Sequence, residues 1–215
     1  MIEFMAALYN EEKNLGDLID HVYPYVWKFN FVDDGSTDNT PELLLQYWDD
    51  INKADLSHFD YKIIRHTGLP ETVKSEALKM CDRDSWVLML DADERFGPGV
   101  LEQIVEFVDS PMAQEVDHIW FTLDEYIDDS YAGRTFLKCR MFKAWAAHFA
   151  DTIHVSDWFD GKGANFGWRV LHKKSREKQE MREREYIATY DKLVEEGKIT
   201  KEQAQALRGN HYFIK

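Results

Sequence analysis

The first half of the chain alternates strand-length apolar runs with segments whose apolar residues follow helical spacing. The strand-length runs lie at residues 2–8, 27–32, 61–65 and 86–90. Segment 41–51, between the second and third runs, has its apolar residues at three- and four-residue intervals. Because parallel strands need a crossover between them, usually a helix, this alternation predicts a parallel or mostly parallel sheet with covering helices.

The second half has a different pattern, with short strand signals and no long helix between them. These signals lie at residues 119–123, 135–142, 148–155 and 168–172. They predict antiparallel or mixed pairing. From Lys173 to Arg184 most residues are charged, and the residues that follow predict helices. We therefore expect residues 1–172 to form one α/β domain, with 173–215 as a helical extension packed on it.

Composition places the chain among ordinary globular proteins that need no disulfide framework. Of its 215 residues, 44% are hydrophobic and 31% are charged, which suffices to build a conventional core. Cys81 and Cys139 form no Cys-x-x-Cys pair. We therefore expect reduced thiols and a cytoplasmic protein, and we favour a bacterial or phage-infected cell as its setting.

The charge balance argues against a large surface for nucleic acid or for an anionic membrane. The chain has 26 Lys and Arg against 40 Asp and Glu, so its formal net charge is −14. Binding to both partners is driven by cationic side chains that release counterions. Duplex DNA is therefore disfavoured as a partner. No stretch approaches the roughly 20 apolar residues that cross a bilayer.

Two carboxylates follow directly on the most apolar strand signal. Asp91 and Asp93 come after the run 86–90, and Pro98 then opens a segment with helical spacing. The carboxyl ends of parallel strands form the edge where open α/β sheets bind ligands. Two carboxylates this close favour a hard divalent cation, Mg²⁺ or Mn²⁺. The alternative is a helix cap that arises by chance in an acidic chain.

A second acidic turn ends the second predicted strand. Asp33 and Asp34 precede Gly35 and Ser36, and they belong to the same predicted sheet edge. A carboxylate there can accept a hydrogen bond from a pyrimidine base or from ribose hydroxyls. The alternative is an Asx-turn. The order of acids before the glycine does not fit a calcium-binding helix-loop-helix.

Three segments in this order resemble a known family. They are ALYNEEKNL (7–15), FVDDGSTDNT (31–40) and LMLDADER (88–95). Together they resemble the nucleotide-sugar half of family 2 glycosyltransferases with the GT-A fold, which implies a Rossmann-like mixed sheet with covering helices. The strand segment 139–142, which contains Arg140, is similar to the Arg-Leu-Phe strand of that family.

The resemblance implies roles by position. The residues implied to bind the nucleotide sugar are Asn10, Glu11, Asp33, Asp34, Lys74, Asp91 and Ala92. It implies Asp93 and Asp91 as ligands of Mn²⁺ or Mg²⁺, with His172 completing the metal shell. A solvated Lys74 and a structural His172 are the alternatives.

The catalytic base is the point where the chain departs from the family pattern. Where many members have Val-His-Glu, this chain has Ile-His-Val, and Val155 cannot take a proton. An inverting transfer needs a base within reach of the acceptor hydroxyl. The candidate bases are Asp151, Asp157 and Glu94, of which we favour Asp151. His154 and Arg140 are expected to contact the acceptor or a phosphate; a core or turn position is the alternative for His154.

These observations predict a metal-dependent, inverting glycosyltransferase that uses a nucleotide-diphosphate sugar, with UDP as the favoured carrier. The hydroxyl acceptor is left open among a saccharide, a lipid-linked glycan and a modified DNA base. One alternative is a catalytically impaired relative that binds the nucleotide sugar. Another is a sugar nucleotidyltransferase, which would need a glycine-rich, Arg-containing loop where this chain has Tyr9-Asn10-Glu11.

Overall fold

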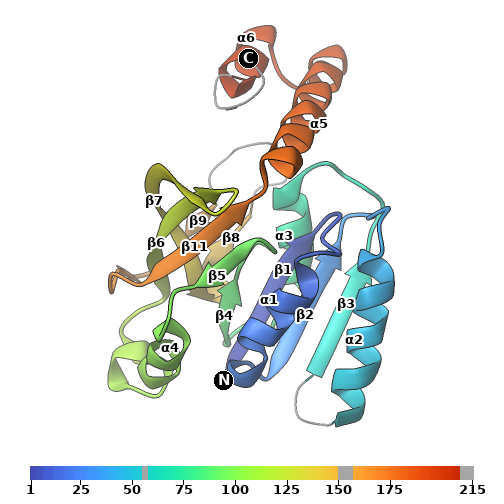
Figure 1. Cartoon of the computed structure of the whole chain (residues 1–215). Helices are drawn as coiled ribbons and strands as arrows, with labels where there is room; N and C mark the ends of the chain where they lie inside the picture. The colour runs from blue at the N-terminus through green and yellow to red at the C-terminus, as the bar shows by residue number, and fades with distance from the viewer. Residues whose placement is uncertain (55–57, 150–156, 209–215) are drawn as a thin grey trace. The chain divides into compact units, whose positions relative to one another are not determined.

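The structure is a computed structural model in which residues 1–54, 58–149 and 157–208 are described. Strands and helices alternate up to residue 89 (Figure 1), in the order β1 (Ile2–Leu8), α1 (Leu15–Val22), β2 (Lys28–Asp33), α2 (Thr40–Ala54), β3 (His58–Ile63), α3 (Pro70–Leu78) and β4 (Trp86–Met89). A second strand, β5 (Glu94–Phe96), then follows before helix α4 (Val100–Val108). The remaining elements are β6 (His118–Ile127), β7 (Ser130–Lys143), β8 (Ala147–His148), β9 (Trp158–Phe159), β10 (Gly163–Ala164), β11 (Arg169–Lys174), α5 (Arg176–Glu195) and α6 (Lys201–Arg208).

A nine-stranded mixed sheet organises the fold. Its order is β3-β2-β1-β4-β7-β6-β11-β5, with β10 beside β6. The first four strands of this order are parallel to one another, β7 is antiparallel to β4, and β5 is antiparallel to β11. The predicted α/β class with a parallel first half and a mixed second half is therefore confirmed. Strands β8 and β9 form a separate antiparallel pair.

Helices cover both faces of the parallel strands. Successive side chains of β1 point to opposite faces of the sheet and belong to different apolar clusters. Phe4 and Leu8 belong to one cluster, which the apolar residues of α1, α2 and α4 complete. Met5 belongs to the other, with Val73 and Ala77 of α3. Helices α1 and α3 therefore pack on opposite faces of the sheet. Both cysteines, Cys81 and Cys139, are free thiols.

The register of the central strands brings their carboxyl ends together. Leu8 at the end of β1 lies beside Asp33 at the end of β2. Met5 of β1 lies beside Met89, the last residue of β4. The segments that follow β1, β2 and β4 therefore start at neighbouring points of one sheet edge, as the sequence predicts.

Strand β5 is one of the elements that the sequence patterns did not predict. It begins at Glu94, directly after the two aspartates, and pairs with β11 so that Glu94 lies opposite His172. This pairing joins residues nearly 80 positions apart in the chain. A strand of three residues is too short to carry a hydrophobic period of its own.

The chain divides into two compact units. One contains Met1–Glu125 and Gly133–His172, and the other contains Tyr126–Ala132 with the described residues from Lys173 onward. All the residues discussed below lie in the first unit. Of the predicted strand 148–155, only its beginning lies within the described residues. The packing of 173–215 as an extension of the same domain stays a prediction.

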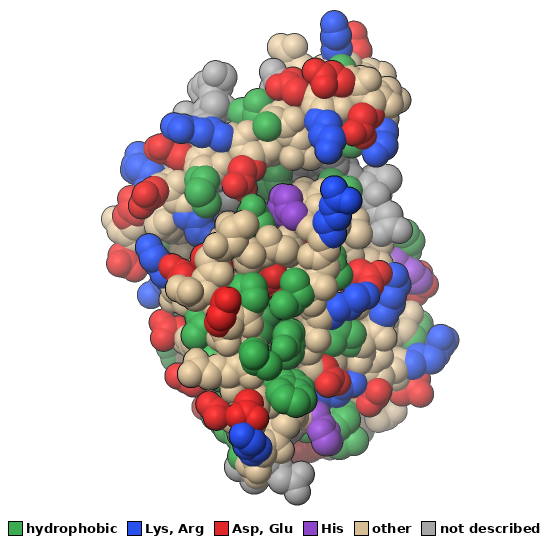
Figure 2. All heavy atoms as spheres, turned by 90° about the vertical axis from the view of Figure 1, so that its right-hand side faces the viewer, with side chains coloured by type: hydrophobic (Ala, Val, Ile, Leu, Met, Phe, Trp, Pro, Cys, Tyr) green, Lys and Arg blue, Asp and Glu red, His purple; other side chains and the backbone are tan. Residues whose placement is uncertain are grey.

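Strand β3 ends the sheet order, and its side of the molecule carries apolar side chains at the surface. Leu45 and Trp48 of α2 and Ile63 of β3 are exposed, and Figure 2 shows hydrophobic side chains gathered near the middle of this face, with acidic and basic groups around them. Among the described residues, β2 is the only strand that pairs with β3, so one set of the backbone groups of β3 has no strand partner there.

Candidate active site

The segment between β4 and β5 is a tight turn, called here the DxD turn (Asp91-Ala92-Asp93). The backbone N–H of Glu94 donates to the carbonyl of Asp91 (2.9 Å), and the N–H of Asp91 donates to Oε2 of Glu94 (3.0 Å). Ala92 is buried beneath the turn. In a strand, residues two positions apart point to the same face, but these residues form a turn. Asp91 and Asp93 therefore have different partners.

Asp91 faces Arg140, a buried residue of β7. Because β7 pairs with β4, it carries Arg140 to the place where β4 gives way to the DxD turn. Nη2 of Arg140 donates to Oδ2 of Asp91 (3.2 Å) and to Oε1 of Glu94. The side chain of Glu94 is fully buried, whereas that of Asp91 is 37% exposed. One guanidinium therefore compensates two carboxylates.

Burial governs the electrostatics of this group. It raises the pKa of Glu94, while attraction to Arg140 acts in the opposite direction. Burial by itself would lower the pKa of Arg140, but attraction to Glu94 and Asp91 raises it overall. A fully buried carboxyl that faces a guanidinium is placed to fix the DxD turn and has no solvent-facing surface. The role of Glu94 as a base stays a prediction.

Asp93 faces His172 across the β5–β11 pairing. Oδ1 of Asp93 lies 3.2 Å from Nε2 of His172, and both side chains are largely buried. Mg²⁺ is commonly held by one or two carboxylates together with substrate phosphates, carboxylate oxygens also suit Mn²⁺, and neutral imidazole is a common metal ligand. Asp93 and His172 fit a metal site of this kind, whereas Asp91 is turned toward Arg140.

Across residues 1–54, 58–149 and 157–208, no three His, Cys, Asp or Glu side chains form a group that could hold a metal ion. If Asp93 and His172 bind a metal ion, they supply only part of its coordination shell, and a diphosphate would have to complete it. The assignment of Asp93, Asp91 and His172 as ligands stays a prediction.

The DxD turn is also held from the side of α1, by two residues that the sequence analysis did not single out. Arg95 donates to the carbonyl oxygens of Ala92 (2.8 Å), Glu94 (2.6 Å) and Asn14 (3.1 Å). Nε2 of His21 in α1 accepts the N–H of Phe96 (3.0 Å). Burial, with repulsion from Arg95, lowers the pKa of His21, which favours the neutral ring that this acceptor role needs.

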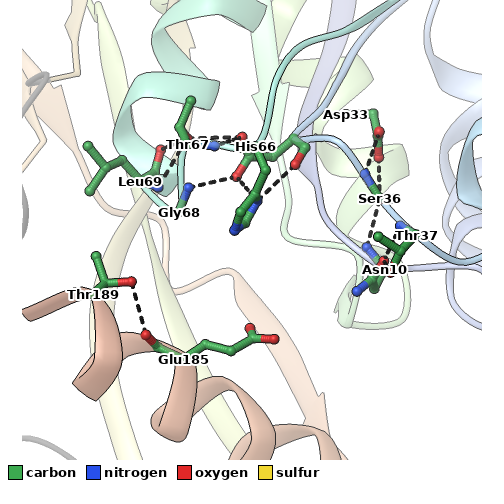
Figure 3. Close-up of polar contacts among 11 residues, drawn as sticks. Asn10, Asp33, Ser36, Thr37, His66, Thr67, Gly68, Leu69, Glu185 and Thr189 are labelled. Carbon is green, nitrogen blue, oxygen red and sulfur yellow. Dashed lines mark hydrogen bonds and ion pairs between the residues drawn. The ribbon is translucent and has the colours of Figure 1, made fainter. Parts of the chain in front are cut away.

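The loops after β1 and β2 are bonded to each other (Figure 3). The N–H of Asn10 donates to Oγ of Ser36 (2.8 Å), and Oδ1 of Asn10 accepts the N–H of Thr37 (2.8 Å). Asn10 has φ of +54°, a left-handed conformation that asparagine tolerates better than most residues. The carboxylate of Asp33 accepts the N–H of Ser36 (2.9 Å). This contact is the Asx-turn that the sequence offered as the alternative to a ligand-binding role. Burial raises the pKa of Asp33.

Glu11 lies where this loop enters α1 and is buried. Its N–H donates to Oγ1 of Thr40 (2.8 Å), and its Oε2 accepts from the side chain of Asn14 (2.9 Å). These contacts attach the start of α1 to the start of α2. Asn10 and Glu11 thus lie at the edge predicted for the nucleobase, and that role stays a prediction.

Asp34 closes the loop that follows β3. Its Oδ1 accepts from N–H (2.7 Å) and Oγ1 (2.9 Å) of Thr67, and its Oδ2 accepts the N–H of Gly68 (3.2 Å). Nδ1 of His66 lies 3.0 Å from Oδ2 of Asp34, and the ring of His66 stacks on Tyr9 with centroids 4.4 Å apart. Figure 3 shows that His66, Thr67 and Gly68 lie close together in this loop. Base or ribose binding by Asp34 stays a prediction.

Lys74 of α3 and Asp157, the residue before β9, form an ion pair. Nζ of Lys74 in α3 lies 3.7 Å from Oδ2 of Asp157, and 6.0 Å from the ring centre of Phe149. Lys138, two residues before Arg140 on β7, interacts electrostatically with Lys74, Arg140, Asp91 and Asp157. Lys138 was not singled out from the sequence.

The candidate base Asp151 and the candidate contact His154 lie outside the described residues. Asp157, the other candidate base in that part of the chain, lies within the described residues. The structure thus brings the predicted residues together in two groups. One surrounds the DxD turn, with Asp91, Asp93, Glu94, Arg140 and His172. The other forms the linked loops after β1, β2 and β3, with Asn10, Asp33 and Asp34.

This mixed sheet with acidic segments at the ends of β2 and β4 is a GT-A glycosyltransferase fold. The chain is similar to S. aureus TarS 1-349 in complex with UDP-GlcNAc, with a TM-score of 0.55 and 13% identity over 99% of this chain and 72% of that one. It is also similar to the mannosyltransferase PcManGT from Pyrobaculum calidifontis in complex with GDP-Man and Mn²⁺, with a TM-score of 0.58 and 14% identity over 93% and 65%. The chain belongs to glycosyl transferase family 2, whose sequence profile matches residues 5–191.

The relatives are in part longer than this chain. The chain spans 23% of one S. aureus TarS chain and 65% of the TarS 1-349 chain in a second structure of that protein. No curated protein matches its sequence significantly. None of the helices in the described ranges combines the length and apolar character that a bilayer crossing requires.

Proposed function

We propose that the chain is a glycosyltransferase that moves a sugar from a nucleotide-diphosphate donor, a UDP-sugar, to a hydroxyl acceptor with inversion and with the help of Mn²⁺ or Mg²⁺. The observation that carries the proposal is the buried pair of Asp93 and His172 (3.2 Å). It lies at the sheet edge where the loops after β1 and β2 are bonded together. Ligands of open α/β sheets bind at such an edge.

The similar structures support this choice of donor and metal. TarS 1-349 has been solved with UDP-GlcNAc and PcManGT with GDP-Man and Mn²⁺. GalNAc-T7, with a TM-score of 0.55 and 11% identity over 81% of this chain and 44% of that one, has been solved with UDP, GalNAc and Mn²⁺. We extend nucleotide-sugar binding and the divalent metal to this chain by that likeness.

In this mechanism the protein groups have separate tasks. A divalent cation, held by Asp93 and His172, would offset the negative charge that develops on the leaving diphosphate. Arg140 and Glu94 keep the DxD turn in shape, and Arg95 ties the turn to α1. The loop of Asn10 and Asp33 borders the nucleoside.

The base must reach the acceptor hydroxyl on the face of the sugar opposite the leaving group. Glu94 is fully buried against Arg140, and Asp157 is engaged with Lys74. Of the three candidates, these contacts leave Asp151 as the residue that we propose for proton removal. The acceptor itself is proposed only as a hydroxyl of a saccharide, a lipid-linked glycan or a modified DNA base.

A panel of UDP, GDP, CDP and dTDP sugars, each with and without Mn²⁺, tests the donor by thermal shift. We expect the largest stabilisation from a UDP-sugar with Mn²⁺, and its loss in Asp93→Ala. Asp50→Ala, an exposed carboxylate of α2, is the matched control. If no nucleotide sugar stabilises the protein, or if Asp93→Ala binds the donor and metal like the wild type, the proposal is wrong.

A second candidate is a relative that binds the nucleotide sugar without transferring it. Two observations favour it, namely Val155 in place of the family's glutamate and the pairing of Asp157 with Lys74. It predicts metal-dependent donor binding with no donor hydrolysis. Hydrolysis of the UDP-sugar that disappears in Asp93→Ala and persists in Asp50→Ala would exclude this candidate.

Competition by duplex DNA in a binding assay at low salt tests DNA as the acceptor.

A further inference from the structure

Arg95 is a side chain that hydrogen-bonds both to the DxD turn and to the loop after β1. Its Nη1 donates to the carbonyl oxygens of Ala92 (2.8 Å) and Glu94 (2.6 Å), and its Nη2 donates to the carbonyl oxygen of Asn14 (3.1 Å), the residue before α1. A guanidinium is planar and carries its donors in a rigid fork, so it holds the groups bonded to it in a defined arrangement. Arg95 therefore fixes the DxD turn relative to the start of α1.

Asn14 belongs to the loop that borders the nucleoside in the proposed function. Its N–H donates to the carbonyl oxygen of Glu11 (2.9 Å), and its side chain donates to Oε2 of Glu11 (2.9 Å). The neighbouring Asn10 is bonded in turn to Ser36 in the loop after β2 (2.8 Å), as Figure 3 shows. Hydrogen bonds and short backbone segments thus connect the DxD turn, through Arg95, to the loops after β1 and β2.

The charge of Arg95 and its hydrogen bonds have opposite expected effects on a bound cation. Burial lowers the pKa of Arg95, and attraction to Asp17, Asp93 and Glu11 acts in the opposite direction. Arginine stays protonated in proteins, so its charge by itself would disfavour a second cation at Asp93. The hydrogen bonds would favour metal binding, because they hold the DxD turn in place before the ligand arrives. Substitutions that keep or remove the charge can separate these two effects.

We propose that Arg95 is a positioning residue that couples nucleotide binding to metal binding. It holds the loop after β1 and the DxD turn in the relative position that one nucleoside diphosphate must span, with the nucleoside at the loop and the diphosphate at the cation. This inference rests on the proposed function, because it assigns a role within the same site. Without these hydrogen bonds, the nucleotide would have to order one segment against the other as it binds, and the metal would strengthen its binding less.

Isothermal titration calorimetry measures this coupling directly. The Kd of UDP is determined without and with saturating Mn²⁺, and the ratio of the two values is the coupling factor. We expect the factor to fall about tenfold in Arg95→Lys, the effect of losing one hydrogen bond from a charged group, because an ammonium keeps the charge but lacks the planar fork. In Arg95→Gln the factor should fall by less, since the repulsion of the cation is lost as well. Arg83→Lys, the same change at an exposed arginine, should leave the factor unchanged.

The outcomes separate coupling from other roles of Arg95. If Arg95 only stabilises the fold, its variants weaken UDP equally with and without Mn²⁺, and the unchanged factor overturns the proposal. If only its charge matters, Arg95→Lys behaves like the wild type and the factor rises in Arg95→Gln, which also overturns it. Either variant decides the question when the other does not fold. These outcomes leave the proposed function standing. In contrast, a wild type that does not bind UDP, or whose UDP affinity is independent of Mn²⁺, overturns the proposed function and this inference with it.

Discussion

Replacing Arg140 with methionine should destabilise the protein strongly, because it leaves a buried carboxylate without its cation. The side chain of Arg140 is 4% exposed and that of its partner Glu94 is 0% exposed. Removing one partner of a buried ion pair costs about 3–5 kcal/mol. For a chain of this size, each kcal/mol lowers the melting temperature by roughly 2–4 °C, so the melting temperature should fall by about 6–20 °C.

The loss of stability in Arg140→Met should depend on pH in a defined direction. The pKa of Glu94 is raised by burial and held down by Arg140, so removing Arg140 raises it further. A carboxyl whose folded-state pKa lies above its unfolded value contributes stability at low pH, and this contribution is lost as the pH rises through the folded-state pKa. The deficit of Arg140→Met relative to the wild type should therefore narrow as the pH falls from 8 toward 5.

Urea unfolding of four proteins at several pH values checks this reasoning. They are the wild type, Arg140→Met, Glu94→Met and the double variant. Replacing both members of a buried pair by apolar residues is often neutral or stabilising, so the double variant should regain most of the stability that either single change loses. A loss below about 1 kcal/mol for Arg140→Met at pH 7, or a double variant as unstable as the sum of the two single losses, would refute the buried-pair argument.

Three further outcomes are expected. His172→Ala should weaken Mn²⁺ binding to the UDP-bound protein by about 10- to 100-fold in a metal titration, and unchanged affinity would remove His172 from the metal site. Gly35→Ala should cost about 1–3 kcal/mol in urea unfolding, since Gly35 has φ of +68° and an added Cβ would lie 2.9 Å from the backbone nitrogen of His66; wild-type stability would contradict this. Asp34→Ala removes the acceptor of two loop N–H groups and should cost about 1–3 kcal/mol with faster amide exchange at Thr67, while unchanged exchange would show that the loop is held by other contacts.

The parallel half of the fold was predictable because its signals are local. Each strand there is an apolar run, and the helices that connect the strands show their period within the segment itself. The acidic turns at 33–36 and 91–94 stand directly after such runs, so their place at one sheet edge follows from topology. The register of Leu8 beside Asp33 bears out that part of the prediction.

The residue patterns alone could not predict the partners of the aspartates, because these partners depend on contacts between distant parts of the chain; only the family resemblance associated His172 with Asp93. From the sequence, Asp91 and Asp93 are expected to hold one divalent cation together; in the structure they occupy a turn, and each has a different partner. Their partners, Arg140 and His172, come from β7 and β11. No local sequence pattern predicts that β5 pairs with β11. The contacts of Arg95 are also not visible in the sequence, because they are made to backbone carbonyls, which every residue has.

These separate partners explain how two acids lie close together at a buried edge. Asp93 is bound to His172 within a largely buried pair, whereas Asp91 is 37% exposed and shares Arg140 with Glu94. If Asp91 turned toward a donor, Arg140 would keep Glu94 as its partner, so no buried charge would be left uncompensated. The cost of that turn should therefore be nearer the 0 to about 1 kcal/mol of an exposed ion pair than the cost of breaking a buried one. In this arrangement Glu94 maintains the shape of the turn through its buried pair with Arg140.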